Sequence, residues 1–176
     1  MNSFEISILE FVHSLIACEW LDIFFKNFTA LGNGGAIWIA ITGIMLISPK
    51  TRKCGITMAI GLILCLIFGN LLLKPLIART RPFDVKTTLE IIIPKPTDFS
   101  FPSGHTFASF ASACTIFKSF RKCGTAALIF AVLMAFSRLY LCVHYPTDVL
   151  AGSILGIIIS YASSRIYCKF FERKSV

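Results

Sequence analysis

The sequence has little charge for its length, and acidic residues are especially few. Asp and Glu number 9 among 176 residues, against 17 Lys and Arg, and charged residues make up only 15% of the chain. Hydrophobic residues make up 56%, whereas a soluble domain has about 45–50% apolar and about 25% charged residues. This composition argues against a soluble protein, and the mean hydropathy of +0.78 agrees with that.

Several other signals are missing. The seven cysteines include no Cys-x-x-Cys pair and are odd in number, so we predict neither a disulfide framework nor a thiolate metal site. There is no nucleic-acid-binding motif, so the net charge of +8 does not indicate a nucleic-acid partner. Glu5 and Glu10 occupy an N-terminus without a basic segment, which is not typical of a cleaved signal peptide.

Long apolar runs are what the chain does have. They fall near residues 4–31, 34–48, 54–77, 103–118, 123–142 and 147–168. A helix needs about 20 residues to cross a bilayer, so the third and sixth runs are long enough without their flanks. No internal repeat occurs, and we predict an all-α, integral-membrane six-helix bundle of one domain over 1–176, with five or six spanning helices. The first run carries several charges, so residues 1–18 either span the membrane or lie along it as an amphipathic helix.

Basic residues gather in three short connections that alternation of the helices puts on one side. They are Lys50, Arg52 and Lys53; Lys118, Arg121 and Lys122; and Arg165, Lys169, Arg173 and Lys174. The positive-inside rule makes that side cytoplasmic. The polar loop 78–102 and the turn 142–146 then face outward, in a multi-pass plasma-membrane protein, although further basic residues in the loop weaken the bias. Tyr140 and Tyr145 are predicted to lie in the interfacial aromatic belt.

Three cations occur at the predicted outward ends of helices. Lys74 lies near the end of the third apolar run and Arg81 just after it, and Arg138 comes after fifteen residues without a charge. Arginine binds phosphate oxygens bidentately and lysine acts as a point charge. For Lys74 alone, an interfacial lysine that reaches toward water is the alternative. That alternative explains Arg138 less well, so the three cations indicate an anion site.

Two histidines accompany the cations. Ser103 and Gly104 open a helix whose N-terminus is suited to an anion, and His105 adds an acid or base there. His144 stands four residues before Asp148, whose carboxylate can accept the Nδ1–H and leave Nε2 free to attack. An ordinary capped helix and a carboxylate favoured by the helix dipole are the respective alternatives.

Together these residues resemble the type-2 phosphatidic acid phosphatase superfamily. Its signature is Lys-x(6)-Arg-Pro, then Pro-Ser-Gly-His, then Ser-Arg-x(5)-His-x(3)-Asp, and residues 74–148 match every position. The resemblance implies a metal-independent phosphatase without cofactors, in which His144 forms a phosphohistidine. Asp148 would orient His144, and His105 would protonate the leaving oxygen. The phosphate ligands it implies are Lys74, Arg81, Ser103, Gly104 and Arg138.

The resemblance also implies a lipid phosphate or diphosphate as substrate. Our first candidate is undecaprenyl diphosphate, hydrolysed to undecaprenyl phosphate in cell-wall carrier recycling, and the second is phosphatidylglycerol phosphate or phosphatidic acid. A non-catalytic lipid-binding or transport protein needs the cations, but it does not need both histidines and Asp148. Asn70 is expected to bind Lys74 or another helix, and Arg79 a lipid headgroup. The loop 83–101 is a candidate lid or headgroup selector, and nothing indicates the oligomeric state.

Overall fold

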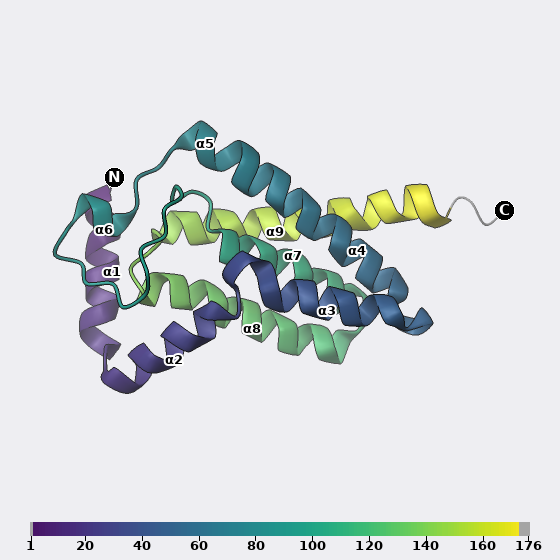
Figure 1. Cartoon of the computed structure of the whole chain (residues 1–176), viewed down its shortest axis with the longest axis horizontal. Coiled ribbons are helices and arrows are strands. Elements are labelled where there is room, and N and C mark those ends of the chain that lie inside the picture. Colours follow the sequence, from purple (N-terminus) through teal and green to yellow (C-terminus); the bar gives the residue numbers. More distant parts are fainter. Residues whose placement is uncertain (1, 173–176) are drawn as a thin grey trace.

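Helices form the regular structure of residues 2–172, the part of the chain that the computed structural model describes (Figure 1), and no strand occurs in that part. The elements are, in chain order, α1 (Asn2–Ile16), α2 (Glu19–Ala30), the 3-10 turn η1 (Asn33–Gly35), α3 (Ala36–Ile47), α4 (Pro49–Cys65), the π-helical η2 (Leu66–Leu73), α5 (Lys74–Ile77), α6 (Pro82–Val85), α7 (Gly104–Ser119), α8 (Arg121–Tyr140), α9 (Pro146–Tyr167) and the π-helical η3 (Cys168–Glu172). The all-α class is confirmed.

The helix breaks occur where the sequence predicts turns. Gly34 and Gly35 have φ values of 58° and 74°, a left-handed conformation that costs glycine little. Ser48 is extended and Pro49 begins α4, a position that tolerates the missing N–H of proline. Pro75 likewise provides no N–H, and the helix before it runs through Leu66–Leu73 in π-helical geometry.

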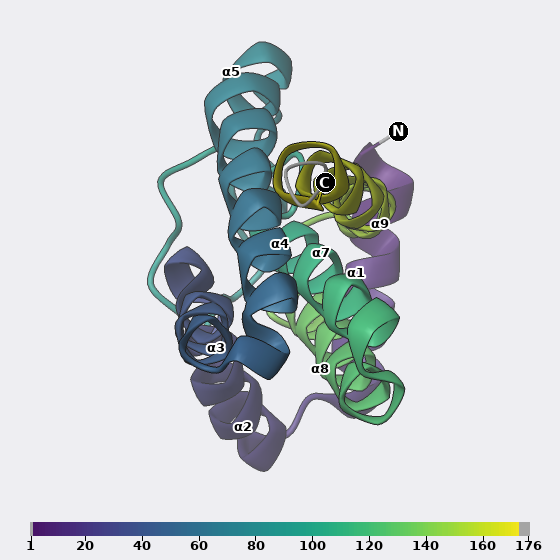
Figure 2. The same cartoon turned by 90° about the vertical axis from the view of Figure 1, so that its right-hand side faces the viewer.

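The centre of the bundle is α7, which packs against α4, α8 and α9 (Figure 2). Its buried residues include hydroxyl side chains that bond to other helices: Ser109 Oγ accepts from Trp38 Nε1 at 2.9 Å, and Thr115 Oγ1 lies 3.1 Å from Ser160 Oγ. A Cβ on Gly152 of α9 would come within 2.9 Å of the Ser103 carbonyl oxygen. Glycine there allows the first turns of α7 and α9 to approach closely.

Fewer helices can span a membrane than we predicted. In the described chain, three helices are long and apolar enough: Pro49–Val85, Arg121–Tyr140 and Pro146–Phe171. The number rises to four if the pair Glu19–Ala30 and Asn33–Ile47, bent by 44°, forms one span. The prediction of five or six counted the short α7, which has 16 residues. It also counted residues 4–31 as one segment, whereas the structure breaks this run into α1 and α2.

The two ends of the bundle differ in what they carry. The α3–α4 junction, the α7–α8 junction and the end of α9 lie at one end of the bundle (Figure 1). The three basic connections therefore lie on the same side of the bundle, as predicted. Arg173 and Lys174 lie outside the described residues. At the other end are α6, the loop 86–103 and α1, which runs across the bundle as expected of a helix along a membrane surface (Figure 1).

Candidate active site

One cavity of about 840 Å³ collects most of the residues that the sequence singled out. Its walls include Asn70, Lys74, Arg81, Gly104, His105, Arg138 and His144. Ser103 and Asp148 lie behind this wall with fully buried side chains, joined by a 3.2 Å hydrogen bond from the Ser103 N–H to the Asp148 carbonyl. Residues of three separate motifs, carried by α5, α7, α8 and the start of α9, therefore meet at one end of the bundle.

His144 occupies the turn between α8 and α9 and is buried. Its Nε2 lies 3.3 Å from Arg81 Nη1. A guanidinium can only donate, so this contact requires a lone pair on Nε2 and places the proton of a neutral ring on Nδ1. Burial lowers the pKa of His144 to about 3, with the cations Arg81 and Arg138 acting in the same direction and the nearby Asp148 carboxylate opposing it. The imidazole is therefore neutral, as a nucleophile must be.

The link between His144 and Asp148 differs from the direct hydrogen bond that we predicted. Nδ1 of His144 lies 3.6 Å from Asp148 Oδ2, which is too long for a hydrogen bond. Ser100 stands beside both groups: its Oγ donates to Asp148 Oδ2 at 2.5 Å and lies 3.4 Å from Nδ1. Sequence reasoning missed Ser100, because nothing but its place two residues before the Pro-Ser-Gly-His motif distinguishes it from other loop serines.

The cations Lys74 and Arg81 share a carboxylate that the sequence did not reveal. Arg81 donates from Nη2 to Asp98 Oδ1 at 2.6 Å and from Nε to the Asp98 carbonyl at 2.8 Å, and Lys74 pairs with the other carboxylate oxygen. Burial raises the pKa of Asp98, but its hydrogen bonds and charge interactions with Lys74 and Arg81 outweigh this and lower it to about 2. The Asp98 side chain is 50% exposed, so an anion on these two cations has access to solvent.

Arg138 is the third cation, on the last turn of α8, and it is buried. One of its terminal nitrogens, Nη1, donates to the hydroxyl of Thr29 on α2. Its Nε has no hydrogen-bond partner within the described residues. A buried, unsatisfied N–H of a charged group is costly, and Arg138 lines the cavity. The arginine thus retains a donor for an anion.

The N-terminus of α7 adds backbone donors to this site. Ser103 is the N-cap, as predicted, but its side chain makes no capping bond and instead accepts from Thr106 Oγ1 at 3.0 Å. A Cβ on Gly104 would lie 3.7 Å from Asn70 Oδ1 and 3.9 Å from Lys74 Nζ. Asn70 and Lys74 therefore converge on the helix end, although no hydrogen bond joins their side chains to each other.

The second histidine, His105, is held by the turn between α2 and α3. Its Nε2 lies 3.0 Å from Asn33 Oδ1. The turn approaches the ring closely, since a Cβ on Gly32 would come within 2.6 Å of His105 Cδ2. Sequence reasoning missed Asn33, because no periodicity or spacing relates it to His105.

Two predictions about aromatic residues and Arg79 were wrong. Tyr140 and Tyr145 are buried rather than interfacial; the Tyr140 hydroxyl donates to Asp22 at 2.6 Å. Arg79 does not extend toward a headgroup: Nη1 donates to Asp148 Oδ1 at 2.5 Å and Nη2 pairs with Glu5 at 2.5 Å. The error came from treating Arg79 as an isolated charge at a helix end, without the tertiary partner that α1 provides.

The described residues 2–172 contain no group of three or more His, Cys, Asp or Glu side chains placed to hold a metal ion. The charged groups that line the cavity are instead Lys26, Lys74, Arg81 and Arg138 with Asp98. Cations of this kind neutralise charge on phosphoryl oxygens. Chemically, the site combines a neutral buried imidazole, a second histidine and a set of phosphate-binding donors.

Comparisons with known proteins identify the family. The family model of the PAP2 superfamily matches residues 54–172. An undecaprenyl-diphosphatase of Sulfolobus acidocaldarius is 39% identical over 131 residues, covering 74% of this chain and 63% of that protein. Undecaprenyl-diphosphatase BcrC of Bacillus subtilis is 37% identical over 118 residues, covering 65% of this chain and 58% of that protein. The chain thus matches less than two thirds of the length of either relative.

A solved structure shares the fold. It is the crystal structure of a transmembrane PAP2 type phosphatidylglycerolphosphate phosphatase from Bacillus subtilis, with a TM-score of 0.76 and 28% sequence identity. The superposition covers 96% of this chain and 87% of that one. The shared fold includes α1 and α2, which precede the residues that the family model matches.

Proposed function

The chain belongs to the PAP2 superfamily, and we propose that it is a membrane phosphatase that hydrolyses a lipid diphosphate, with undecaprenyl diphosphate as first candidate. The observation that carries the lipid substrate is the shape of the cavity, whose walls continue along α4 and η2 from Lys74 back through Leu66 and Ile63 to Ala59. These residues precede Lys74 on one continuous helix, so the apolar wall leads away from the cations. A headgroup at Lys74 thus leaves room for its chain beside Ile63.

The proposed reaction begins with attack of His144 Nε2 on phosphorus. Arg81, 3.3 Å from Nε2, binds a phosphoryl oxygen next to the attacking atom. Burial, with the cations Arg138, Lys74 and Arg81 acting in the same direction, lowers the pKa of His105 to about 2 in the free protein, and the negative charge of a bound phosphate opposes this shift. The bond from phosphorus to the leaving oxygen breaks, and His105, protonated in the substrate complex, donates its proton to that oxygen. The products of this step are the lipid alcohol or monophosphate and a phosphohistidine, with His105 neutral.

The second half of the reaction restores the enzyme. His105 accepts a proton from water, and the resulting hydroxide attacks phosphorus while the bond to Nε2 breaks. His144 leaves as a neutral imidazole whose Nδ1 proton faces Ser100 and Asp148. The cations Lys74 and Arg81 neutralise the transferring phosphoryl group throughout both steps, together with Arg138 and the N-terminus of α7.

Undecaprenyl diphosphate is the first candidate because it is named in two similar proteins. Phosphatidylglycerol phosphate is the second, favoured by the structural relative that covers 96% of this chain. A non-catalytic lipid-binding protein is disfavoured because both His105 and His144 line the cavity. We further propose that the site faces outward from the plasma membrane, since it lies at the bundle end opposite the basic connections.

Phosphate release in detergent tests the proposal. The purified protein is assayed in excess EDTA with undecaprenyl diphosphate, phosphatidylglycerol phosphate and phosphatidic acid at matched surface concentration. We expect release in EDTA and preference for the diphosphate. Preference for phosphatidylglycerol phosphate would replace the first candidate with the second. No release from a folded protein, or release that requires Mg²⁺ after substrate aggregation is excluded, would contradict the proposed reaction.

A further inference from the structure

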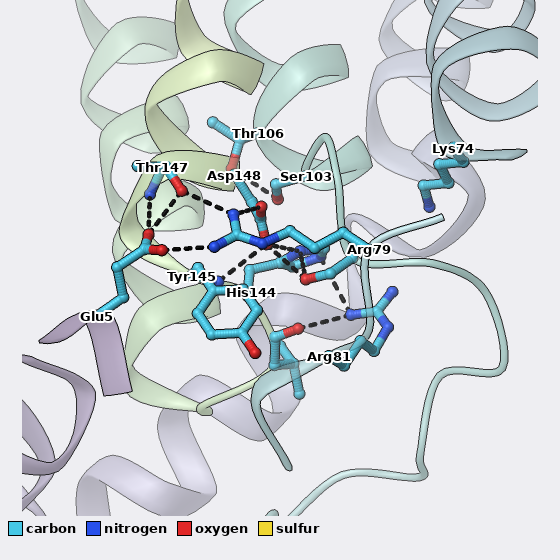
Figure 3. Close-up of polar contacts among 12 residues, drawn as sticks. Glu5, Lys74, Arg79, Arg81, Ser103, Thr106, His144, Tyr145, Thr147 and Asp148 are labelled. Carbon is cyan, nitrogen blue, oxygen red and sulfur yellow. Dashed lines mark hydrogen bonds and ion pairs between the residues drawn. The ribbon is translucent and has the colours of Figure 1, made fainter. Parts of the chain in front are cut away.

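A chain of buried charges extends behind His144, on the side away from the cavity. Arg79 stands between two carboxylates, with Nη1 2.5 Å from Asp148 Oδ1 and Nη2 2.5 Å from Glu5 Oε2. Figure 3 shows Glu5 and Lys74 on opposite sides of this cluster, with Arg79 reaching toward Asp148 and Thr147. The order Glu5, Arg79, Asp148, Ser100 and His144 thus leads from α1 to the proposed nucleophile.

These charges are almost withdrawn from water. The side chain of Arg79 is 16% exposed, that of Glu5 is 7% exposed and that of Asp148 is fully buried. An unpaired buried carboxylate is strongly unfavourable, whereas a buried pair with good hydrogen bonds is tolerated. Since His144 is neutral, it provides no counter-charge for Asp148, and Arg79 provides it instead.

The contacts of Arg79 fix its direction as well as its charge. Its guanidinium lies 3.9 Å above the centroid of the Tyr145 ring, and Nη1 also donates to Thr147 Oγ1 at 2.7 Å. Glu5 in turn accepts from the backbone N–H of Thr147 at 3.1 Å and from its hydroxyl at 2.6 Å. One residue of α1 therefore holds both the arginine and the first turn of α9, which carries Asp148.

We infer that Arg79 is a positioning residue for Asp148, and that Glu5 makes α1 part of the catalytic unit; this inference rests on the proposed function. With Oδ1 held by Arg79, the other oxygen of Asp148 faces Ser100 and the Nδ1 of His144. Loss of Arg79 leaves Asp148 held through Oδ2, by Ser100 and by the backbone N–H of Tyr145, so the imidazole loses part of the support that fixes its tautomer and direction.

Nothing in the signature or the family match assigns this pair a role. Arg79 occupies an unspecified position of Lys-x(6)-Arg-Pro, and Glu5 precedes the matched residues 54–172. Arg79 is also absent from the cavity wall that holds the phosphate-binding groups. Its effect should therefore appear in the chemical steps, and the binding of phosphate should be unaffected.

A matched control lies one turn further along α1. Lys86 pairs with Glu10, joining the same two segments of the chain, but their side chains are 40% and 42% exposed and neither contacts Asp148. If Arg79 and Glu5 only hold α1 against the rest of the protein, removing the Lys86–Glu10 pair should lower kcat in the same way. If they position Asp148, kcat should fall only when Arg79 or Glu5 is replaced.

The experiment compares Arg79→Gln, Glu5→Gln and the double variant with Lys86→Gln and Glu10→Gln, in detergent. We expect Arg79→Gln to lower kcat by about 10- to 100-fold and Arg79→Lys to restore part of it. The Ki of inorganic phosphate, which reports on the cation cluster, should stay within about twofold of wild type. Glu5→Gln should lower kcat less, and the double variant should match Arg79→Gln, since the two residues act through one contact.

The outcomes separate this inference from the proposed function. Inactive wild-type protein would contradict the proposed function itself. Active wild type with an unchanged kcat in Arg79→Gln overturns the inference, as does an equal loss in Lys86→Gln. A large rise in the phosphate Ki would assign Arg79 to phosphate binding instead. If thermal unfolding shows that Arg79→Gln does not fold, the kcat values of Glu5→Gln and Arg79→Lys test the inference instead. Wild-type kcat in both of these variants would overturn the inference.

Discussion

Arg79 and Arg81 are two residues apart, yet they contact opposite sides of the His144–Asp148 pair. Arg81 lies on the cavity side, 3.3 Å from Nε2, and shares with Lys74 the half-exposed carboxylate of Asp98. Arg79 lies on the far side, paired with Glu5 and Asp148, whose side chains are buried. The same residue type thus pairs with a half-exposed carboxylate on one side and with buried carboxylates on the other. This difference in exposure is the basis for proposing Arg81 as a binding group and Arg79 as a positioning group.

The largest effect is expected from replacing His144, the residue that lies between the Arg81 side and the Arg79 side. His144→Asn deletes the proposed nucleophile and should lower kcat by roughly 10³-fold or more. The substitution lies in a turn at the bundle end, so the fold should persist, as thermal unfolding in detergent can show. Normal hydrolysis by the folded variant would contradict a phosphohistidine mechanism.

On the cavity side, Arg138→Lys keeps the charge but loses the planar fork of donors. We expect kcat/KM to fall by about 10²-fold and the Ki of inorganic phosphate to rise, because lysine cannot reproduce the geometry of an arginine–phosphate contact. Steady-state kinetics with inorganic phosphate as inhibitor provide both values. An unchanged Ki together with a lower kcat would show that Arg138 positions other groups and does not bind phosphate.

On the side of His144 away from the cavity, Ser100→Ala tests whether a residue that contacts Asp148 affects kcat alone. The hydroxyl that bonds Asp148 at 2.5 Å is lost, so the imidazole should be less well oriented and kcat should fall by about tenfold. KM and the phosphate Ki should not change, since Ser100 does not line the cavity. A change confined to KM would show that the serine acts on substrate binding.

The smallest effect is expected from Asp98→Asn, which removes the internal anion from Lys74 and Arg81. The Ki of inorganic phosphate should fall by about two- to fivefold, the size expected for a half-exposed ion pair. A rise in Ki would show that Asp98 helps to form the phosphate site.

Asp98 also gives the protein a pH dependence of known sign. Its pKa is lowered to about 2 in the folded protein, below the value of about 3.9 for an unfolded chain. Its contribution to stability is therefore present above about pH 4 and lost as the pH falls toward 2. The melting temperature of wild type should exceed that of Asp98→Asn above pH 4, and the difference should shrink on acidification.

The sequence was a good guide to the cavity side and a poor guide to the far side. Lys74, Arg81, His105, Arg138 and His144 are each distinguished by being polar or charged beside an apolar run, and the structure brings them to one cavity. Their roles stay predictions. The helix breaks at Gly34–Gly35 and Ser48 were equally predictable, since they depend on local backbone preferences.

The residues that the sequence did not reveal, on either side, depend on tertiary contacts that no local pattern contains. Ser100 and Asp98 belong to the loop 86–103, which has no regular structure, so its path is set by what it packs against. The Glu5–Arg79 pair joins residues 74 positions apart. The number of spanning helices was overestimated because apolar runs do not show where a helix ends: α7 has only 16 residues, and the run 4–31 divides into α1 and α2.

The most direct test of the central claim is to look for the phosphoryl group on His144. The variant His105→Asn should slow hydrolysis of the intermediate, so rapid quenching after mixing with the preferred lipid substrate should trap it. We predict that peptide mass analysis at neutral to basic pH finds one phosphoryl group on His144, and none in a variant that also carries His144→Asn. Release of the lipid product without phosphorylated His144, or with the phosphoryl group on another residue, would contradict the account.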